Sequence, residues 1–230
     1  MKKVIVITGG NSGLGKETAK ILSGKNKIVI LGKNEREVKK TAKELKCDGI
    51  ICDITDIEQV KKSIAKIIKK YKKINCLINN AGVWIKGPID GNNPEQIKNT
   101  LLVNTFGTIL VTNVVVPQFK KQKFGRIINI ISQAGLNARA ERSVYNSSKW
   151  AITGFTKCLQ LELSKFNISV LGFYPGFIHT NIFGKAGDSK TDFSTAMPVE
   201  KTAKAVVYLV EVDEDISLNA LEIQNLNSLK

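Results

Sequence analysis

An apolar run leads directly into a glycine-rich turn in the segment Val4-Ile5-Val6-Ile7-Thr8-Gly9-Gly10-Asn11-Ser12-Gly13-Leu14-Gly15. A short apolar run bounded by a turn is typical of a buried strand. Glycines let the backbone turn sharply and approach a ligand closely, because they carry no Cβ. The helix expected from about Gly13 to Leu22 would direct its free N–H groups at a pyrophosphate. The segment therefore predicts a strand, a phosphate-binding turn and a helix.

The turn has two other possible interpretations. A tight loop without a ligand also contains glycines, but the position between a first strand and a first helix favours binding. A P-loop is excluded, because no Gly-Lys-Ser/Thr sequence follows at the required spacing.

Apolar runs alternate with helical patterns along the whole chain. Most runs are apolar throughout, as in parallel strands covered on both faces. This alternation predicts an α/β fold: a single doubly wound Rossmann-type domain over residues 1–230, with a seven-stranded, mostly parallel sheet and helices on both faces. The cofactor-binding part should occupy about 1–130, and the catalytic and substrate part about 131–230. The expected strands are Lys3–Thr8, Lys27–Leu31, Gly49–Cys52, Cys76–Asn79, Arg126–Ile131, Ile168–Phe173 and Leu221–Ile223.

Three helix starts are readable from a capping residue followed three positions later by Glu or Gln. In one of them a proline, Pro94, falls at the first helical position, where its missing N–H does no harm. The pairs are Asn34 with Glu37, Thr55 with Glu58, and Asn93 with Gln96.

The chain is strongly basic, with 35 Lys and Arg against 20 Asp and Glu, a net charge of +15. Such an excess occurs in nucleic-acid-binding proteins. Here many lysines surround an apolar stripe formed by Val60, Ile64, Ile67 and Tyr71, as on a solvated amphipathic helix. We therefore expect no nucleic-acid partner.

Several classes of protein are disfavoured by the remaining composition. No apolar run reaches the roughly 18 to 20 residues that span a bilayer, so no membrane association is expected. The four cysteines lack C-x-x-C spacing, which suits a reducing, cytoplasmic location. The single histidine, His179, excludes a metal site that needs two histidine ligands, so no metal is expected.

Tyr145 and Lys149 are four residues apart, so both side chains lie on one face of a helix. A fixed positive charge favours the phenolate and lowers a tyrosine pKa, as a tyrosine acid/base at neutral pH requires. Most pairs at this spacing are merely packed or solvated. This pair gains weight from Ser132, which follows a strand-like run thirteen residues upstream.

The tip of the second strand bears on coenzyme preference. A carboxylate there would bond the ribose 2′-OH of NAD and repel a 2′-phosphate. The sequence instead has Lys33, followed by Asn34. This favours NADP(H), with NAD(H) as the alternative coenzyme, unless Lys33 is simply a solvated lysine.

Seven motifs occur in order along the chain, and together they resemble the short-chain dehydrogenase/reductase family. The resemblance covers essentially the whole chain. The motifs are Thr-Gly-x-x-x-Gly-x-Gly at Thr8 to Gly15, Asp53 closing the third strand, Asn-Asn-Ala-Gly at Asn79 to Gly82, Asn104, Ser132, Tyr145-x-x-x-Lys149, and Pro175-Gly176 followed by Thr180.

The resemblance implies a mechanism and a coenzyme site. Tyr145 would be the general acid or base, Ser132 would hold the substrate oxygen, Lys149 would lower the pKa of Tyr145 and hold the nicotinamide ribose, and Asn104 would anchor a relay water. In the alternative, Ser132 only caps a strand end and Asn104 only satisfies a helix carbonyl. The implied coenzyme-binding residues are Gly9, Asn11, Ser12, Leu14, Gly15, Lys33, Asn34, Asp53, Ile54, Asn80, Ala81, Gly82, Tyr145, Lys149, Pro175, Gly176, Ile178 and Thr180.

The chain end departs from a common family pattern, because no Val-Asp-Gly-Gly sequence follows the last strand. That ending is similar to the NADP-dependent carbonyl-reductase-like subgroup. Apolar faces on the long helices near Ile97–Phe119 and Val144–Phe166 imply a homodimer or homotetramer. The substrate pocket should be formed by Val83–Asn93, Gln133–Ser143 and Phe177–Met197.

The expected function is hydride transfer between NADP(H) and a small-molecule carbonyl or secondary alcohol. The alternative is a catalytically silent nucleotide-binding regulator of the same fold.

Overall fold

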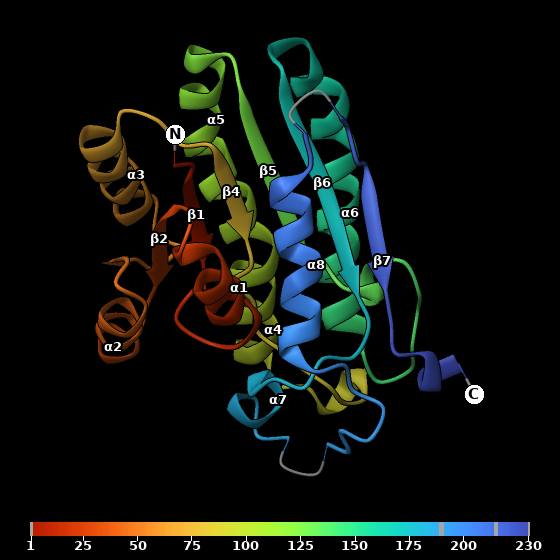
Figure 1. The fold of residues 1–230 in the computed structure, drawn as a ribbon. Coiled ribbons are helices and arrows are strands. Elements are labelled where there is room, and N and C mark those ends of the chain that lie inside the picture. Colours follow the sequence, from red (N-terminus) through yellow and green to blue (C-terminus); the bar gives the residue numbers. More distant parts are fainter. Residues whose placement is uncertain (1, 189–190, 214–215, 230) are drawn as a thin grey trace.

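A seven-stranded sheet forms the centre of the molecule in the computed structural model, which describes residues 2–188, 191–213 and 216–229. The strand order is β3-β2-β1-β4-β5-β6-β7, and each neighbouring pair is parallel (Figure 1). The predicted α/β fold is thereby confirmed. The strands are β1 (Val4–Thr8), β2 (Lys27–Gly32), β3 (Asp48–Ile51), β4 (Cys76–Asn79), β5 (Gly125–Ile130), β6 (Ile168–Pro175) and β7 (Ala220–Ile223).

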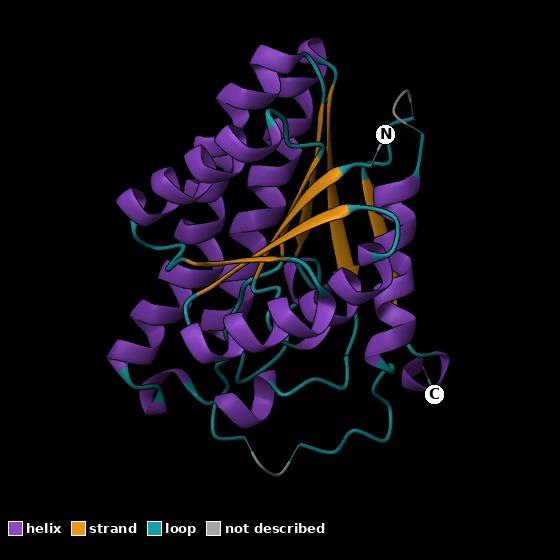
Figure 2. Cartoon of the chain, turned by 60° about the vertical axis from the view of Figure 1, so that its left-hand side comes forward, coloured by secondary structure: helices purple, strands orange, loops and turns teal. Residues whose placement is uncertain are grey.

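Helices cover both faces of the sheet, as Figure 2 shows. The helices α1 (Gly13–Ser23), α2 (Glu35–Leu45) and α8 (Val199–Glu211) pack on one face, against Ile5, Ile7 and Ile128. The helices α3 (Ile57–Tyr71), α5 (Thr108–Gln122) and α6 (Ser143–Leu163) pack on the other, against Val6, Val29 and Ile127. Two apolar cores therefore sandwich the sheet. Strands buried on both faces explain why the runs are apolar without alternation.

The strand order reverses at β1, which pairs with β2 on one side and β4 on the other. In open α/β sheets, ligands bind outside the carboxyl ends of the strands at such a switch point. Three shorter helical segments lie at or near this end of the sheet: η3 (Gln133–Gly135), α7 (Ile182–Lys185) and η5 (Leu226–Leu229). The remaining short turns are η1 (Ile89–Gly91) and η4 (Ser164–Phe166).

Two of the three predicted helix starts are confirmed. Asn34 accepts the N–H of Glu37 at 3.0 Å and begins α2. Asn93 begins α4 (Pro94–Leu101), although it accepts the N–H of Glu95 at 2.8 Å rather than that of Gln96.

The predicted start at Thr55 is wrong. Asp56 caps α3 instead, accepting the N–H groups of Glu58 and Gln59. The Thr55 hydroxyl donates to Asp53 at 2.7 Å, so its oxygen is turned away from the helix. An ionised carboxylate accepts N–H bonds more strongly than a hydroxyl, which explains the choice.

One helical rod runs from Pro94 to Gln122, through α4, the π-helical turn η2 (Leu102–Gly107) and α5. Among the described residues this is the one helix with the length and apolar composition to cross a membrane. Its side chains Val111, Val115 and Phe119 are fully buried against the sheet and α3. Core helices of globular domains have the same character, and we read the rod as one of them.

Candidate functional site

A cleft of about 1200 Å³ lies at the carboxyl edge of the sheet. It is lined by the turns that follow β1 to β6, by α7 and by the C-terminal residues Asn227 and Ser228. Every residue predicted to bind the coenzyme lines it, with the exception of Gly15, and so does Ser132. Asn104 lies behind its wall. The volume exceeds that of typical small-molecule pockets, so a dinucleotide and a substrate fit together.

The glycine-rich turn has the geometry of an anion cradle. Gly9 and Gly13 have φ values of +63° and +53°, which side chains disfavour, and a Cβ on Gly9 would lie 2.9 Å from the Cα of Ala81. Ser12 begins α1, but its side chain accepts no helix N–H. The first N–H groups of α1 are therefore free of a side-chain cap, which fits a pyrophosphate bound there.

Gly15 lies one layer behind the residues that line the cleft. A Cβ at this position would collide with the amide of Asn80. That amide donates to the carbonyls of Thr8 and Gly9. Thr8 Oγ1 in turn accepts the N–H groups of Asn80 and Ala81, at 3.0 and 3.1 Å. Gly15 thus makes room for the contacts that fix the β4 turn beside the β1 turn.

The part of the cleft at the tip of β2 contains more carboxylates than the sequence of that tip suggested. Lys33, 80% exposed, forms an ion pair of 2.7 Å with Asp53, which is 21% exposed. Burial raises the pKa of the Asp53 carboxyl, but Lys33 and Thr55 outweigh it, and the net direction is down. Glu37 accepts from Asn11 at 2.7 Å.

Glu37 also contacts the opposite wall of the cleft. The ammonium of Lys185, on α7, lies 3.3 Å from its carboxylate. The two residues are 148 positions apart, and no sequence pattern signalled the contact. The ion pair joins α2 on one wall of the cleft to α7 on the other.

Ser132, Tyr145 and Lys149 meet at the end of β5. Tyr145 and Lys149 are 9% and 7% exposed, and the Lys149 ammonium lies 5.7 Å from the centre of the tyrosine ring. Lys149 Nζ donates to the carbonyl of Ile130 at 3.1 Å. Ser132 has a φ of 141°, in a region that is nearly restricted to glycine. Backbone strain of this kind concentrates at functional sites.

The pKa of Tyr145 differs from the expected direction. Burial raises the pKa of the phenol to about 12, although the Ser132 hydroxyl and the Arg142 guanidinium act in the opposite sense. Burial also lowers the pKa of Lys149 to about 8. Lys149 is not among the groups that lower the tyrosine pKa, so that part of the prediction is wrong for the protein without bound coenzyme. Desolvation of the buried phenol is the largest contribution to its pKa.

Asn104 occupies the π-helical turn, where it is 1% exposed. Its Oδ1 accepts the N–H of Val83 at 2.8 Å, and its Nδ2 donates to the Val83 carbonyl and to Ser148 Oγ, at 3.0 and 3.1 Å. The Ser148 hydroxyl donates to the carbonyl of Tyr145 at 2.6 Å. Asn104 therefore links the loop after β4 to the helix that carries the tyrosine. π-Helical turns are frequent at functional sites.

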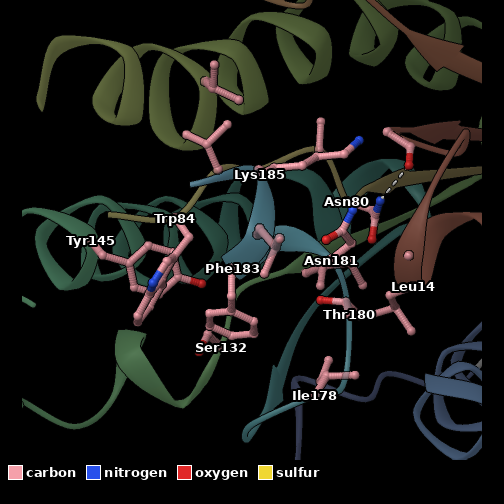
Figure 3. Close-up of a pocket in the computed structure, with 18 of the residues that line it drawn as sticks. Leu14, Asn80, Trp84, Ser132, Tyr145, Ile178, Thr180, Asn181, Phe183 and Lys185 are labelled. Atoms are coloured by element: carbon pink, nitrogen blue, oxygen red, sulfur yellow. Dashed lines mark hydrogen bonds between the residues drawn. The ribbon is translucent and has the colours of Figure 1, made fainter. Parts of the chain in front are cut away.

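An aromatic wall closes the cleft next to the tyrosine. The ring of Trp84 lies 4.5 Å from that of Tyr145, edge to face, and 5.2 Å from that of Phe183. Phe177 lies 5.2 Å from Phe183 and stacks on Phe193 at 5.5 Å. Figure 3 shows Trp84 beside Tyr145, with Phe183 and Ser132 nearby. All three predicted pocket segments contribute, apart from residues 189–190, which lie outside the described residues.

The motif arrangement and its geometry agree with a match to a family model. The model described as short chain dehydrogenase matches residues 3–191. The chain belongs to the short-chain dehydrogenase family. It is therefore a NAD(P)-dependent oxidoreductase that acts on a small-molecule substrate.

Relatives of this short-chain dehydrogenase cover most of its length. An uncharacterized oxidoreductase of Staphylococcus saprophyticus is 28% identical over 96% of this chain and 97% of its own. The mouse dehydrogenase/reductase SDR family member 7B is 31% identical over 78% of this chain and 58% of its own.

Among solved structures, a 3-ketoacyl-(acyl-carrier-protein) reductase from Brucella melitensis complexed with NADH has a TM-score of 0.89 and 26% identity. The match covers 98% of both chains. A single-substitution variant of actinorhodin polyketide ketoreductase with NADPH has a TM-score of 0.88 and 25% identity. That match covers 97% of this chain and 96% of the other.

Proposed function

We propose that this short-chain dehydrogenase transfers a hydride between NADP(H) and a carbonyl or secondary alcohol, with Tyr145 as the proton donor or acceptor. The observation that carries the proposal is the meeting of Ser132, Tyr145 and Lys149 in the cleft that the glycine-rich turn also lines. The two ketoreductases similar to this chain support a carbonyl substrate.

The cleft residues would hold the coenzyme along its length. Gly9, Ser12 and the first turn of α1 face the pyrophosphate, whose charge the helix N-terminus favours. At one end, Asp53 and Ile54 contact the adenine. At the other, the segment Pro175–Thr180 holds the nicotinamide. When bound, the nicotinamide supplies or accepts the hydride.

The protein's own contribution is orientation and proton transfer. The Ser132 hydroxyl donates to the substrate oxygen and so fixes it beside Tyr145. With its pKa raised to about 12, the phenol keeps its proton at neutral pH and donates it to the developing alkoxide. Lys149 bonds the nicotinamide ribose. Asn104 holds the loop after β4 and the Tyr145 helix in register. The protonated phenol is the form that carbonyl reduction requires as proton donor.

The preference for NADP(H) rests on Lys33. Its ammonium is highly exposed at the tip of β2, and a 2′-phosphate is a stronger partner for it than the Asp53 carboxylate. Lys185, on the opposite wall, adds a second ammonium beside Glu37. The two carboxylates moderate this preference, and we expect slower turnover with NAD(H).

The exposed apolar side chains of the long helices bear on the oligomeric state. The apolar side chains of Leu101, Leu102, Phe106, Trp150 and Leu161 are exposed on the rod and on α6, which supports a homodimer or homotetramer formed through these helices. We further propose one functional unit in the cytoplasm, with coenzyme bound mainly by residues 1–130 and substrate by 131–230. The silent-regulator alternative is disfavoured, because Ser132, Tyr145, Lys149 and Asn104 are all present.

The decisive experiment records NADPH or NADH oxidation at 340 nm with a panel of ketones, aldehydes and quinones. We expect turnover with at least one carbonyl, a ~100- to 10,000-fold lower kcat for Tyr145→Phe, and unchanged NADPH binding. Lys33→Met should reduce kcat/KM with NADPH about tenfold and leave that with NADH unchanged.

Two results contradict the proposal. NADPH binding without turnover, in both the wild type and Tyr145→Phe, would establish the silent regulator. Turnover with NADH that equals or exceeds turnover with NADPH would contradict the coenzyme preference inferred from Lys33.

A further inference from the structure

An arginine that forms no ion pair with a carboxylate of the described residues lines the cleft close to the catalytic tyrosine. Arg142 precedes α6 and is half-buried, and its guanidinium lies 5.1 Å from the ring centre of Trp84. That ring is 4.5 Å from the ring of Tyr145. The guanidinium and the phenol ring therefore both lie close to one indole (Figure 3 labels Trp84 and Tyr145).

The charges around Arg142 leave it uncompensated. Within residues 2–188, 191–213 and 216–229, no carboxylate forms an ion pair with it. Burial lowers the pKa of its guanidinium, and Arg139, which lines the same cleft, lowers it further; Asp188 and Glu141 act in the opposite sense. Glu141 is the ion-pair partner of Lys86, at 3.8 Å. The guanidinium is therefore available to bind an anionic ligand.

The indole beneath Arg142 also lacks a partner. Trp84 Nε1 is a buried donor with no acceptor in the part of the chain that the structure describes. Buried donors of this kind are rarely left unpaired. Phe177 and Phe183 supply an apolar surface beside it. The guanidinium cation, the indole N–H and the aromatic walls are together complementary to a ligand with an anionic end and an apolar body.

We propose that the substrate is a keto acid, whose carboxylate is bound by Arg142 while its apolar body lies against Trp84 and its carbonyl faces Tyr145. This inference rests on the proposed carbonyl chemistry and narrows its substrate class. Arginine binds a carboxylate through two parallel N–H bonds, which fixes orientation as well as affinity. Arg142 is then the residue that determines specificity.

The first test compares 4-acetylbenzoate with its neutral methyl ester, two aryl ketones that differ by one charge. We expect the wild type to reduce the acid with the higher kcat/KM. Arg142→Met should lower the acid-to-ester ratio of kcat/KM about 10- to 100-fold, the loss of one charged bidentate contact. Arg36→Met, which removes the same charge from the exposed surface of α2, should leave the ratio unchanged.

The second test measures binding without turnover. Trp84 and Trp150 are the two tryptophans of the chain, and Trp150 is 51% exposed on α6. In a Trp150→Phe background, fluorescence therefore reports Trp84 alone. We expect 4-acetylbenzoate to change it with a Kd at least about tenfold below that of the ester, and Arg142→Met to remove the difference.

The two tests separate the two proposals. If the acid binds preferentially but no ketone is reduced, the carboxylate site stands and the reductase proposal is wrong. If ketones are reduced and the acid has no advantage in either test, or Arg142→Met retains that advantage, the keto-acid proposal is wrong.

Discussion

Replacing Lys149 by methionine should stabilise the protein while abolishing its activity. The ammonium is 7% exposed, and burial lowers its pKa from 10.5 to about 8. Each unit of pKa difference corresponds to about 1.4 kcal/mol, so a charged Lys149 destabilises the folded state by ~3 kcal/mol at neutral pH. Methionine has a similar length and no charge. The bond from Nζ to the Ile130 carbonyl is lost, which offsets about 1 kcal/mol of the gain.

The pH dependence gives this prediction its sign. The unfolded lysine has the higher pKa, so between about pH 8 and 10.5 the unfolded state binds more protons and wild-type stability rises with pH. The destabilisation by the charge is complete below about pH 8. It should fall from ~3 kcal/mol at pH 7 to ~1.5 kcal/mol at pH 9.5. The raised pKa values of Tyr145, Cys47 and Cys76 are common to both proteins and cancel in the difference.

The assay is equilibrium unfolding in urea, followed by circular dichroism at pH 7 and pH 9.5 without coenzyme. Lys157→Met, an exposed lysine on the same helix, is the matched control and should show no pH-dependent difference. A Lys149→Met protein no more stable than the wild type at pH 7 would refute the reasoning. So would a stability gap of equal size at both pH values.

Three further outcomes are expected. Arg126→Met should lower the free energy of unfolding by ~3 kcal/mol in urea, because the buried guanidinium donates to carbonyls at the end of α8, including that of Val212 at 2.6 Å; a loss below 1 kcal/mol would contradict this. Gly9→Ala should abolish NADPH binding measured by calorimetry, since its Cβ would lie 2.9 Å from Ala81. An undiminished affinity for NADPH would contradict the role of the glycine-rich turn in binding the coenzyme phosphates. Ser132→Gly should raise stability by ~1 kcal/mol over Ser132→Ala, because glycine relieves the strain at φ 141°, while both lose kcat; equal stabilities would contradict strain.

The sequence predicted the sheet well because its strands are recognisable locally. Cys76–Asn79 is predicted with the observed bounds, and the other six strands lie within two residues of theirs at each end. Continuous apolar runs have one explanation, burial on both faces. Helix starts were less secure, since Thr55 and Asp56 are adjacent and both can cap. The choice depends on a local hydrogen bond from the Thr55 hydroxyl to Asp53, which the capping pattern does not take into account.

Most motif residues were placed in the cleft for the same reason, because they follow directly from a strand end; Tyr145 and Lys149, on α6, do not. The contacts that sequence reasoning missed join distant segments. Lys185 reaches Glu37 across 148 positions, and Arg142 reaches Trp84 from another loop. The direction of the Tyr145 pKa was also missed, because spacing gives proximity but not burial. A local sequence pattern predicts neither the contacts between distant segments nor the burial of a side chain.

The π-helical turn lets the two halves of one helical rod pack against different neighbours. Its extra residue rotates everything upstream by about 100° relative to a regular helix. Past the turn, α5 presents its apolar stripe to β4 and β5, while α4 before it contacts α6. Asn104 lies where the helical phase changes, and its Oδ1 accepts the N–H of Val83. Removing a single residue there would turn one half of the rod away from its partner, so the number of residues in this turn is constrained as well as their identity.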